Sequence, residues 1–347
     1  MHKKDITAMC PSDTAVEFSH VKKTFVRSQT ALAGKEVIRR LFHPKQEQIH
    51  ALDDVTFTVK QGEFTACAGP NGAGKSTTMK LACGILLPNS GQVRVLGCHP
   101  ETERIRLMRQ IGVLFGNRTE LWWDHPLIQS FEWKKAVWNI PEAVYQKNLQ
   151  TAVQLLDLQP LLSTFARELS LGQRMKADIA MLLLSSPKLL LLDEPTLGLD
   201  VTAKRQLMAF LKQENRQNGT TILVTSHDMD DLEEMTDRIL MIANGKLVYD
   251  GTYDGLRTLS GHRQRLVITS EREIPEGALP CRLVDRRQGE TEYELNTEET
   301  SFSALLQRLA ALPAIRGVEI RKAPIEQVVD ALYNQWQDTG THEKTTD

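Results

Sequence analysis

The chain has 347 residues, of which 41% are hydrophobic and 25% are charged. These fractions are those of an ordinary folded protein, and the length is enough for about two domains, so a chain that is disordered throughout is excluded. Its 42 Lys and Arg residues nearly balance its 44 Asp and Glu residues, and the resulting net charge of -2 excludes a strong positive field for nucleic acid.

The cysteines and the apolar runs indicate where the protein works. The five cysteines are spread along the chain without a C-x-x-C pair, which fits a reducing compartment better than a disulfide framework or a zinc site. The first residues are polar and charged, so we expect no export signal. The longest apolar run, Ile179 to Leu184, is far shorter than the roughly 20 residues that cross a bilayer. If the protein works at a membrane, another chain is expected to span it.

Three regions follow one another along the chain. From about residue 14 to 261, apolar runs alternate with helical patterns, which predicts an α/β domain with buried parallel strands and a hairpin turn at Asn244-Gly245. The stretch 262–336 combines amphipathic helical patterns with short strand-like pieces and predicts a small α+β domain. The polar tail 337–347 is expected to be disordered.

A basic stretch, 27–50, is inserted near the start of the first domain. It carries five Lys or Arg residues against two Glu residues. Charge runs of this kind commonly belong to solvated surface loops. The alternative is a contact with lipid headgroups or with a membrane partner.

A glycine-rich phosphate-binding pattern stands at Gly69–Thr77. It fits G-x-x-x-x-G-K-[ST] and lies between the strand-like run Phe64–Ala68 and a helical run. Glycines let backbone N–H groups approach phosphates, and the N-terminus of the helix adds unpaired donors. We expect Lys75 to neutralise phosphate charge and Ser76 to bind Mg²⁺. The residues expected to contact ATP are Gly69, Pro70, Asn71, Gly72, Ala73, Gly74, Lys75, Ser76 and Thr77.

Two adjacent carboxylates follow the apolar run Leu189–Leu192. Asp193 and Glu194 stand where a buried strand meets its C-terminal loop, the place where α/β sheets bind ligands. Adjacent side chains on a strand point to opposite faces, so we expect separate roles. Asp193 is the expected Mg²⁺ ligand, and Glu194 is expected to orient and deprotonate the water that attacks the γ-phosphate. With the phosphate loop, this pair predicts nucleotide hydrolysis.

Three further motifs distinguish among the many kinds of phosphate-loop protein. Leu169-Ser170-Leu171-Gly172-Gln173 precedes the carboxylates, Gly198-Leu199-Asp200 follows them, and the strand-like Thr221–Val224 leads to His227. In this order they resemble the signature sequence, the D-loop and the switch histidine of ABC ATPases. The resemblance extends over about residues 16–252.

The resemblance implies a fold and an assembly. The fold is a P-loop NTPase ABC cassette of the α/β class, with a mixed sheet, a RecA-like core and a helical lobe at about 117–180. The stretch 262–336 is similar to the small α+β C-terminal extension of several exporter ATPases. The family works as a head-to-tail dimer that holds ATP between the phosphate loop of one subunit and the signature of the other. Ser170, Gly172, Gln173 and Asp200 would thus complete the partner's site.

The same resemblance assigns roles to three other positions. His227 contacts the γ-phosphate in the family and is therefore expected to be a third catalytic residue beside Lys75 and Glu194. Phe25 stands where the family stacks an aromatic ring on adenine, although a phenylalanine of the strand core is the alternative. Asn117 replaces the usual glutamine that reaches Mg²⁺ and the attacking water. Its side chain is one methylene shorter, so direct metal contact is in doubt and a bridging water could fill the gap.

The stretch from Asn117 to Pro126, which contains Leu121-Trp122-Trp123-Asp124, together with Leu171 and Arg174, resembles a bacterial exporter subgroup with ABC-2-type permeases. Trp122 and Trp123 are either core aromatics or part of the groove that receives a coupling helix of the permease.

These motifs predict the motor subunit of an ABC transporter, an ATPase that uses ATP and Mg²⁺. Its expected partners are a separate ABC-2-type permease and a second ATPase subunit, most simply a second copy of itself. Its expected place is the cytoplasmic face of the cell membrane, as a peripheral protein, and its expected direction of transport is export. The alternative is a soluble ABC ATPase that acts on ribosomes or nucleic acid.

Overall fold

The computed structural model describes 13–28, 46–116, 118–259, 263–275, 277–287, 289–296, 301–312 and 315–322, and the single positions 325, 328, 329, 332 and 333. Three of the predictions above therefore fall outside the described residues: the placement of Asn117, the middle of the basic stretch and the polar tail. The chain divides into two compact units. The first consists of Met1–His227 and Glu234–Asp250, and the second of Asp228–Glu233 and Gly251–Asp347.

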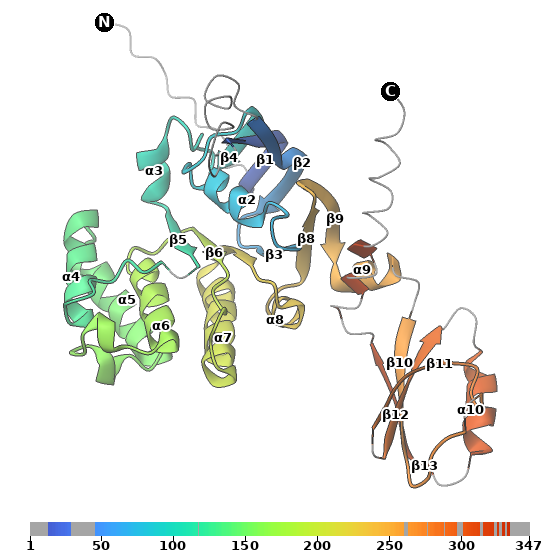
Figure 1. The fold of residues 1–347 in the computed structure, drawn as a ribbon. Coiled ribbons are helices and arrows are strands. Elements are labelled where there is room, and N and C mark those ends of the chain that lie inside the picture. Colours follow the sequence, from blue (N-terminus) through green and yellow to red (C-terminus); the bar gives the residue numbers. More distant parts are fainter. Residues whose placement is uncertain are drawn as a thin grey trace, which may run out of the picture. The chain divides into compact units, whose positions relative to one another are not determined.

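The first unit contains two sheets (Figure 1). One is antiparallel with the strand order β2-β1-β4 and is formed by β1 (Thr14–Ser28), β2 (Gln46–Lys60) and β4 (Ser90–Val95). The other has the order β5-β6-β7-β3-β8-β9 and is formed by β3 (Phe64–Ala68), β5 (Ile111–Phe115), β6 (Leu189–Asp193), β7 (Thr221–Thr225), β8 (Arg238–Ala243) and β9 (Lys246–Thr252).

The larger sheet is parallel from β5 to β8. Its strands β3, β6 and β7 are buried at every residue, as expected for parallel strands covered on both faces. The turn Asn244-Gly245 has positive φ at both residues, 49° and 76°, and joins β8 to β9, so the predicted hairpin is confirmed. Because β9 returns along β8, the sheet is mixed.

The helices of the first unit are α2 (Lys75–Ala82), α3 (Arg104–Met108), α4 (Leu127–Trp138), α5 (Glu142–Leu155), α6 (Leu171–Leu183) and α7 (Val201–Asn218), with short 3₁₀ turns at Gln159–Leu161 and Ala166–Glu168. Helix α8 (Met229–Met235) belongs mostly to the second unit. In Figure 1, α4, α5 and α6 lie together as a helical group. None of the helices within the described ranges has the length and apolar composition that crossing a bilayer requires.

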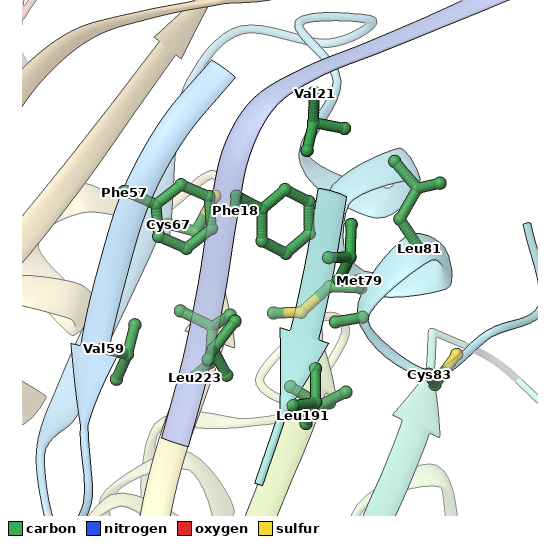
Figure 2. Packing of buried hydrophobic residues seen from close by; sticks show 14 of the residues in the cluster. Phe18, Val21, Phe57, Val59, Cys67, Met79, Leu81, Cys83, Leu191 and Leu223 are labelled. Carbon is green, nitrogen blue, oxygen red and sulfur yellow. The ribbon is translucent and has the colours of Figure 1, made fainter. Parts of the chain in front are cut away.

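The core of the first unit joins the two sheets through α2. Phe18 of β1 and Phe57 of β2 stack with ring centroids 4.7 Å apart. Figure 2 shows these rings near Met79 of α2, with Leu191 of β6 and Leu223 of β7 in the same cluster. All five side chains are nearly inaccessible to solvent. The helix that follows the phosphate loop is therefore anchored by its buried face, and its first residue is held against the sheet.

The ends of the basic stretch differ from the prediction of a loop. Strand β1 runs to Ser28 and β2 begins at Gln46, and Arg27 pairs with Glu47 in the antiparallel register. A loop was expected because the charge run hides the strand pattern. The extended hairpin instead follows from backbone pairing, which depends little on which polar side chains it carries.

The second unit is a small α+β structure. Its antiparallel sheet has the order β11-β12-β10-β13. The elements are α9 (Tyr253–Leu259), β10 (Arg263–Ser270), β11 (Arg282–Arg287), β12 (Glu290–Asn296), α10 (Phe302–Ala310) and β13 (Ile315–Lys322). Leu305 and Leu309 of α10 pack against Leu266 and Ile268 of β10. This unit has a hydrophobic core of its own.

Candidate nucleotide-binding site

The glycine-rich loop connects the end of β3 with the start of α2. Gly72 and Gly74 have φ of 81° and 118°, conformations that favour glycine. A Cβ at Gly74 would lie 2.5 Å from the carbonyl oxygen of Ala51 and 2.6 Å from Leu52 Cδ2, so the residue must be glycine for the backbone to pass. Gly74 also caps α2 without a side-chain hydrogen bond. The first turn of α2 therefore keeps backbone donors for a phosphate.

Lys75, the first residue of α2, is nearly buried beneath this loop. Its Nζ donates to the carbonyl oxygens of Gly69 at 2.7 Å and Pro70 at 3.3 Å. The ammonium group thus lies inside the loop, where it can neutralise the charge of a bound triphosphate.

Asp193, at the end of β6, lies next to the start of α2. Its Oδ1 accepts hydrogen bonds from Thr225 Oγ1 at 2.6 Å and from Ser76 Oγ at 3.2 Å. A carboxylate and a hydroxyl held this close are oxygen ligands of the kind that Mg²⁺ takes, usually with phosphate oxygens and water. The described residues contain no cluster of three or more His, Cys, Asp or Glu side chains suited to a metal ion. One carboxylate and one hydroxyl leave the other ligand positions of Mg²⁺ to water and phosphate oxygens, so these residues fit an ion that binds together with a nucleotide.

Glu194 faces a different partner. Its Oε2 lies 2.9 Å from His227 Nδ1 and accepts a hydrogen bond from the His227 backbone N–H at 3.2 Å. Its φ of 56° is rare for a residue with a side chain, and its backbone N–H donates to the Thr225 hydroxyl and carbonyl oxygens. These bonds hold the strained residue in place and aim its carboxylate away from that of Asp193.

A cavity of about 540 Å³ lies over these groups. Its lining brings the phosphate loop together with Glu194 and His227, from strands far apart in sequence. The lining residues are Asn71, Gly72, Ala73, Gly74, Lys75, Ser76, Thr77, Glu194, Leu197 and His227.

Phe25 lies on β1 and is not among the residues that line this cavity. Its side chain is exposed, at 38% of its full area, and the Lys23 ammonium lies 5.4 Å from its ring centroid. The alternative of a buried core phenylalanine is therefore wrong. An exposed ring remains available for stacking.

The predicted signature and D-loop residues gather at a second place, where α6 and α7 begin. Ser170 caps α6 in a capping box: its Oγ accepts from the Gln173 backbone N–H, and the Gln173 side chain accepts from the Ser170 N–H. Asp200 caps α7 by accepting from the Ala203 N–H at 2.9 Å. A Cβ at Gly172 would lie 3.2 Å from Ala203 Cβ, so the two helix starts are in close contact. The cavity is not lined by any of the four predicted residues, which are Ser170, Gly172, Gln173 and Asp200.

The tryptophan pair is not part of a core. Trp122 and Trp123 are exposed at 38% and 47% of their full areas, so the core alternative is wrong. Trp122 lies beside His125 and Trp133, and the Arg174 guanidinium lies 4.7 Å from the Trp123 ring centroid.

Two residues of this region were not singled out from the sequence. The Thr225 hydroxyl donates to the Asp193 carboxylate and accepts from the Glu194 backbone N–H, and the only sequence signal for it is its place at the end of a strand, two residues before His227. Asp178 is buried in α6 and accepts hydrogen bonds from the segment that follows β5. No local pattern in α6 distinguishes Asp178, because the residues that donate hydrogen bonds to it are distant in the sequence.

Comparison with known proteins places this arrangement in one family. A family model described as "ABC transporter" matches residues 52–197. The energy-coupling factor transporter ATP-binding protein EcfA of Methanoculleus marisnigri is 32% identical over 238 residues, which are 68% of this chain and 84% of EcfA. YbhF of Escherichia coli, a probable multidrug ABC transporter ATP-binding protein, is 31% identical over 237 residues, and the match spans 68% of this chain and 40% of YbhF.

A solved structure shows the same fold. The dimeric, post-hydrolysis ATP-binding cassette MJ0796 bound to ADP and Pi superposes with a TM-score of 0.57 at 24% identity, over 68% of this chain and 98% of that one. At this identity the likeness concerns the fold, and it agrees with the P-loop cassette expected from the motifs.

Proposed function

The chain belongs to the ATP-binding proteins of ABC transporters and is an ATPase of that family, and we propose that two copies of it hydrolyse ATP at their interface to drive a separate membrane permease. The observation that carries this proposal is the division of its motifs between two places. The phosphate loop, Glu194 and His227 share one cavity, whereas the signature residues lie elsewhere. A second copy is the simplest source of the missing side of the cavity.

In the proposed reaction the chain's own residues bind and orient the nucleotide. The first turn of α2 and the Lys75 ammonium bind the β- and γ-phosphates, and the exposed ring of Phe25 supports adenine. Ser76 and Asp193 would hold Mg²⁺. When bound, the ion supplies charge neutralisation to the phosphate oxygens.

Glu194 and His227 are the proposed pair at the γ-phosphate. The Glu194 carboxylate is within hydrogen-bond distance of the His227 ring and main chain, and both line the cavity beside the phosphate loop. Glu194 can orient a water and accept its proton, while His227 holds the carboxylate in place and contacts the phosphate. Asp193 is already committed to Ser76 and Thr225. The two carboxylates therefore divide the work as their positions indicate.

The partner subunit is proposed to contribute Ser170, Gly172, Gln173 and Asp200. In this chain all four lie at or near helix N-termini, which carry positive partial charge and attract phosphate. Closure around ATP and opening after loss of the γ-phosphate would give the permease its two states. We further propose an ABC-2-type permease, export as the direction and the cytoplasmic face of the membrane as the location. These finer points rest on the motif at 121–124 and on the similarity to YbhF.

A crosslinking experiment tests the shared site. Asn71 lies in the phosphate loop and Ser170 at the signature, so a chain with Asn71→Cys and Ser170→Cys in a Glu194→Gln background should form two disulfides between copies when ATP and Mg²⁺ are added. Cys67, Cys83 and Cys98 are buried and give little background, whereas Cys281 is only half-buried, so Cys10 and Cys281 are replaced by serine in every variant. The single-cysteine variants are the controls. ATP-loaded protein that stays monomeric and yields no crosslink would refute the shared site.

A further inference from the structure

Asp178 is a buried carboxylate with no role in the reaction described so far. It lies in the middle of α6 with 6% of its area exposed. Its Oδ1 accepts hydrogen bonds from Thr119 Oγ1 at 2.8 Å and from the Glu120 backbone N–H at 3.2 Å. Burial raises the pKa of this carboxyl to about 6, with Glu120 and Arg174 as its charged neighbours. An apolar side chain would fill this place at less cost in desolvation, so the carboxylate must be explained by what it holds.

The segment that it holds, residues 118–124, emerges from the hydrolytic site. Phe115, the last residue of β5, pairs with Asp193, and the Gly116 backbone N–H donates to the Asp193 carbonyl at 2.9 Å. Thr119 follows only a few residues later. The Thr119 hydroxyl, besides donating to Asp178, accepts from the Leu121 backbone N–H at 3.1 Å. The position of this short segment is therefore linked to the strand end that carries the proposed Mg²⁺ ligand.

A second contact joins the same segment to the same helix. Arg174 is one turn before Asp178 on α6, so both side chains lie on one face. The Arg174 guanidinium stacks on Trp123, whose carbonyl oxygen accepts from the Arg167 backbone N–H at 3.1 Å. Segment 118–124 is thus attached to α6 at Arg174 and at Asp178, on the two successive turns that follow Ser170 along the helix.

We propose that Asp178 is a positioning residue for ATP hydrolysis, which holds segment 118–124 against α6 so that the end of β5 and the signature turn keep a set separation. It acts through its neighbours and does not touch the nucleotide. The inference deepens the proposed function, because it takes Asp193 and Ser170 to act on nucleotide.

The test compares the ATPase kinetics of the full chain with those of variants at position 178. Asp178→Ala removes the acceptor, and we expect kcat to fall about tenfold with KM for ATP changed by less than about twofold, since geometry is lost and nucleotide contacts are kept. Asp178→Asn keeps an acceptor oxygen for Thr119 and Glu120, so its kcat should stay within about twofold of the unmodified chain. Amide exchange across 118–124 should become faster in Asp178→Ala and stay slow in Asp178→Asn.

A stability-matched control separates positioning from packing. Ile179, the next residue of α6, is fully buried, and Ile179→Ala should lower thermal stability without changing kcat below the melting temperature. The proposal is overturned if Asp178→Ala keeps its full kcat, if Ile179→Ala loses as much, or if Asp178→Asn fails to restore activity.

Ser170→Arg distinguishes this inference from the shared site. If the shared site is wrong, Ser170→Arg stays active, and a loss of kcat in Asp178→Ala then reports on the end of β5 alone. If only the present inference is wrong, Ser170→Arg is inactive while Asp178→Ala is unchanged.

Discussion

The two helix starts that bear the phosphate loop and the signature differ in how they are capped. Helix α2 begins at a glycine that offers no side chain, whereas α6 begins with a closed capping box between Ser170 and Gln173. The first arrangement leaves backbone donors for an outside anion. The second satisfies two backbone donors within the chain, those of Gln173 and Ser170, and leaves the helix ordered before any ligand arrives.

This difference indicates why one copy alone would hold only part of the proposed shared site. The region around α2 has the cavity, the Lys75 ammonium and both carboxylates, while α6 begins with a preformed helix end of positive partial charge whose capping residues do not line that cavity. In the proposed dimer, the start of α2 binds the nucleotide and the start of α6 completes the site of a second copy. Each of the following experiments alters one of these regions and leaves the other intact.

The largest effect is expected at Glu194. Glu194→Gln should lower the ATP hydrolysis rate about a hundredfold or more, because the amide cannot accept the proton of the attacking water. ATP binding, measured by filter retention or calorimetry, should be unchanged, since the phosphate loop is intact. Glu214→Gln, which removes a carboxylate of α7 that is not among the residues lining the cavity, is the control. Near-normal turnover in Glu194→Gln would remove this residue from its proposed role.

Lys75 tests whether α2 is the region that binds. Lys75→Ala should weaken ATP binding about tenfold to a hundredfold. This range corresponds to the roughly 1.5 to 3 kcal/mol that hydrogen bonds to a charged group contribute. The matched control is Lys176→Ala on α6, whose ammonium donates to Gln206. Equal loss of binding in both variants would show that the two helices do not differ in the proposed way.

The capping box at α6 predicts a smaller effect on stability. Ser170→Ala removes the side-chain cap and should cost about 1 kcal/mol in the free energy of unfolding of the first unit. Ser301, the residue before α10, makes no capping hydrogen bond, so Ser301→Ala should cost much less. Urea unfolding monitored by circular dichroism measures both. Indistinguishable costs would mean that the cap of α6 contributes nothing before ligand binds.

Stability should also depend on pH through Asp178. Its pKa is raised from 3.8 to about 6 in the folded chain, so the folded state binds this proton more tightly than the unfolded state. The free energy of unfolding therefore falls as pH rises from about 4 to about 6, by at most about 3 kcal/mol. Asp178→Asn lacks this loss, and its stability advantage should be larger at pH 7.5 than at pH 4.5. A constant difference between these pH values would contradict the assignment.

Local patterns predicted the phosphate-binding parts of the site. Gly69–Thr77 lies between a strand and a helix because glycine spacing and apolar runs act over a few residues, and the structure has this arrangement. The separate directions of Asp193 and Glu194 were also foreseeable, although the reason differs in part. Glu194 lies beyond the strand with a positive φ, so backbone conformation as well as strand alternation turns its side chain.

Contacts between distant residues could not be predicted in the same way. The bond between Ser76 and Asp193 joins residues 117 positions apart, and that between Asp193 and Thr225 joins residues 32 apart. Their geometry depends on β6 and β7 being neighbours in the sheet, which no local pattern encodes. The strand ends of the basic stretch were missed for the same reason, since pairing of β1 with β2 decided them.

The amino-acid sequence by itself determined the order of the motifs, the glycines that a phosphate loop requires and the alternation of strands and helices, because these depend on residue type and short-range spacing. Only the tertiary structure decided that the phosphate loop shares a cavity with Glu194 and His227 and that Asp178 holds segment 118–124. These features arise from hydrogen bonds and burial between segments far apart in the chain, and their energies exist only once the sheets have assembled.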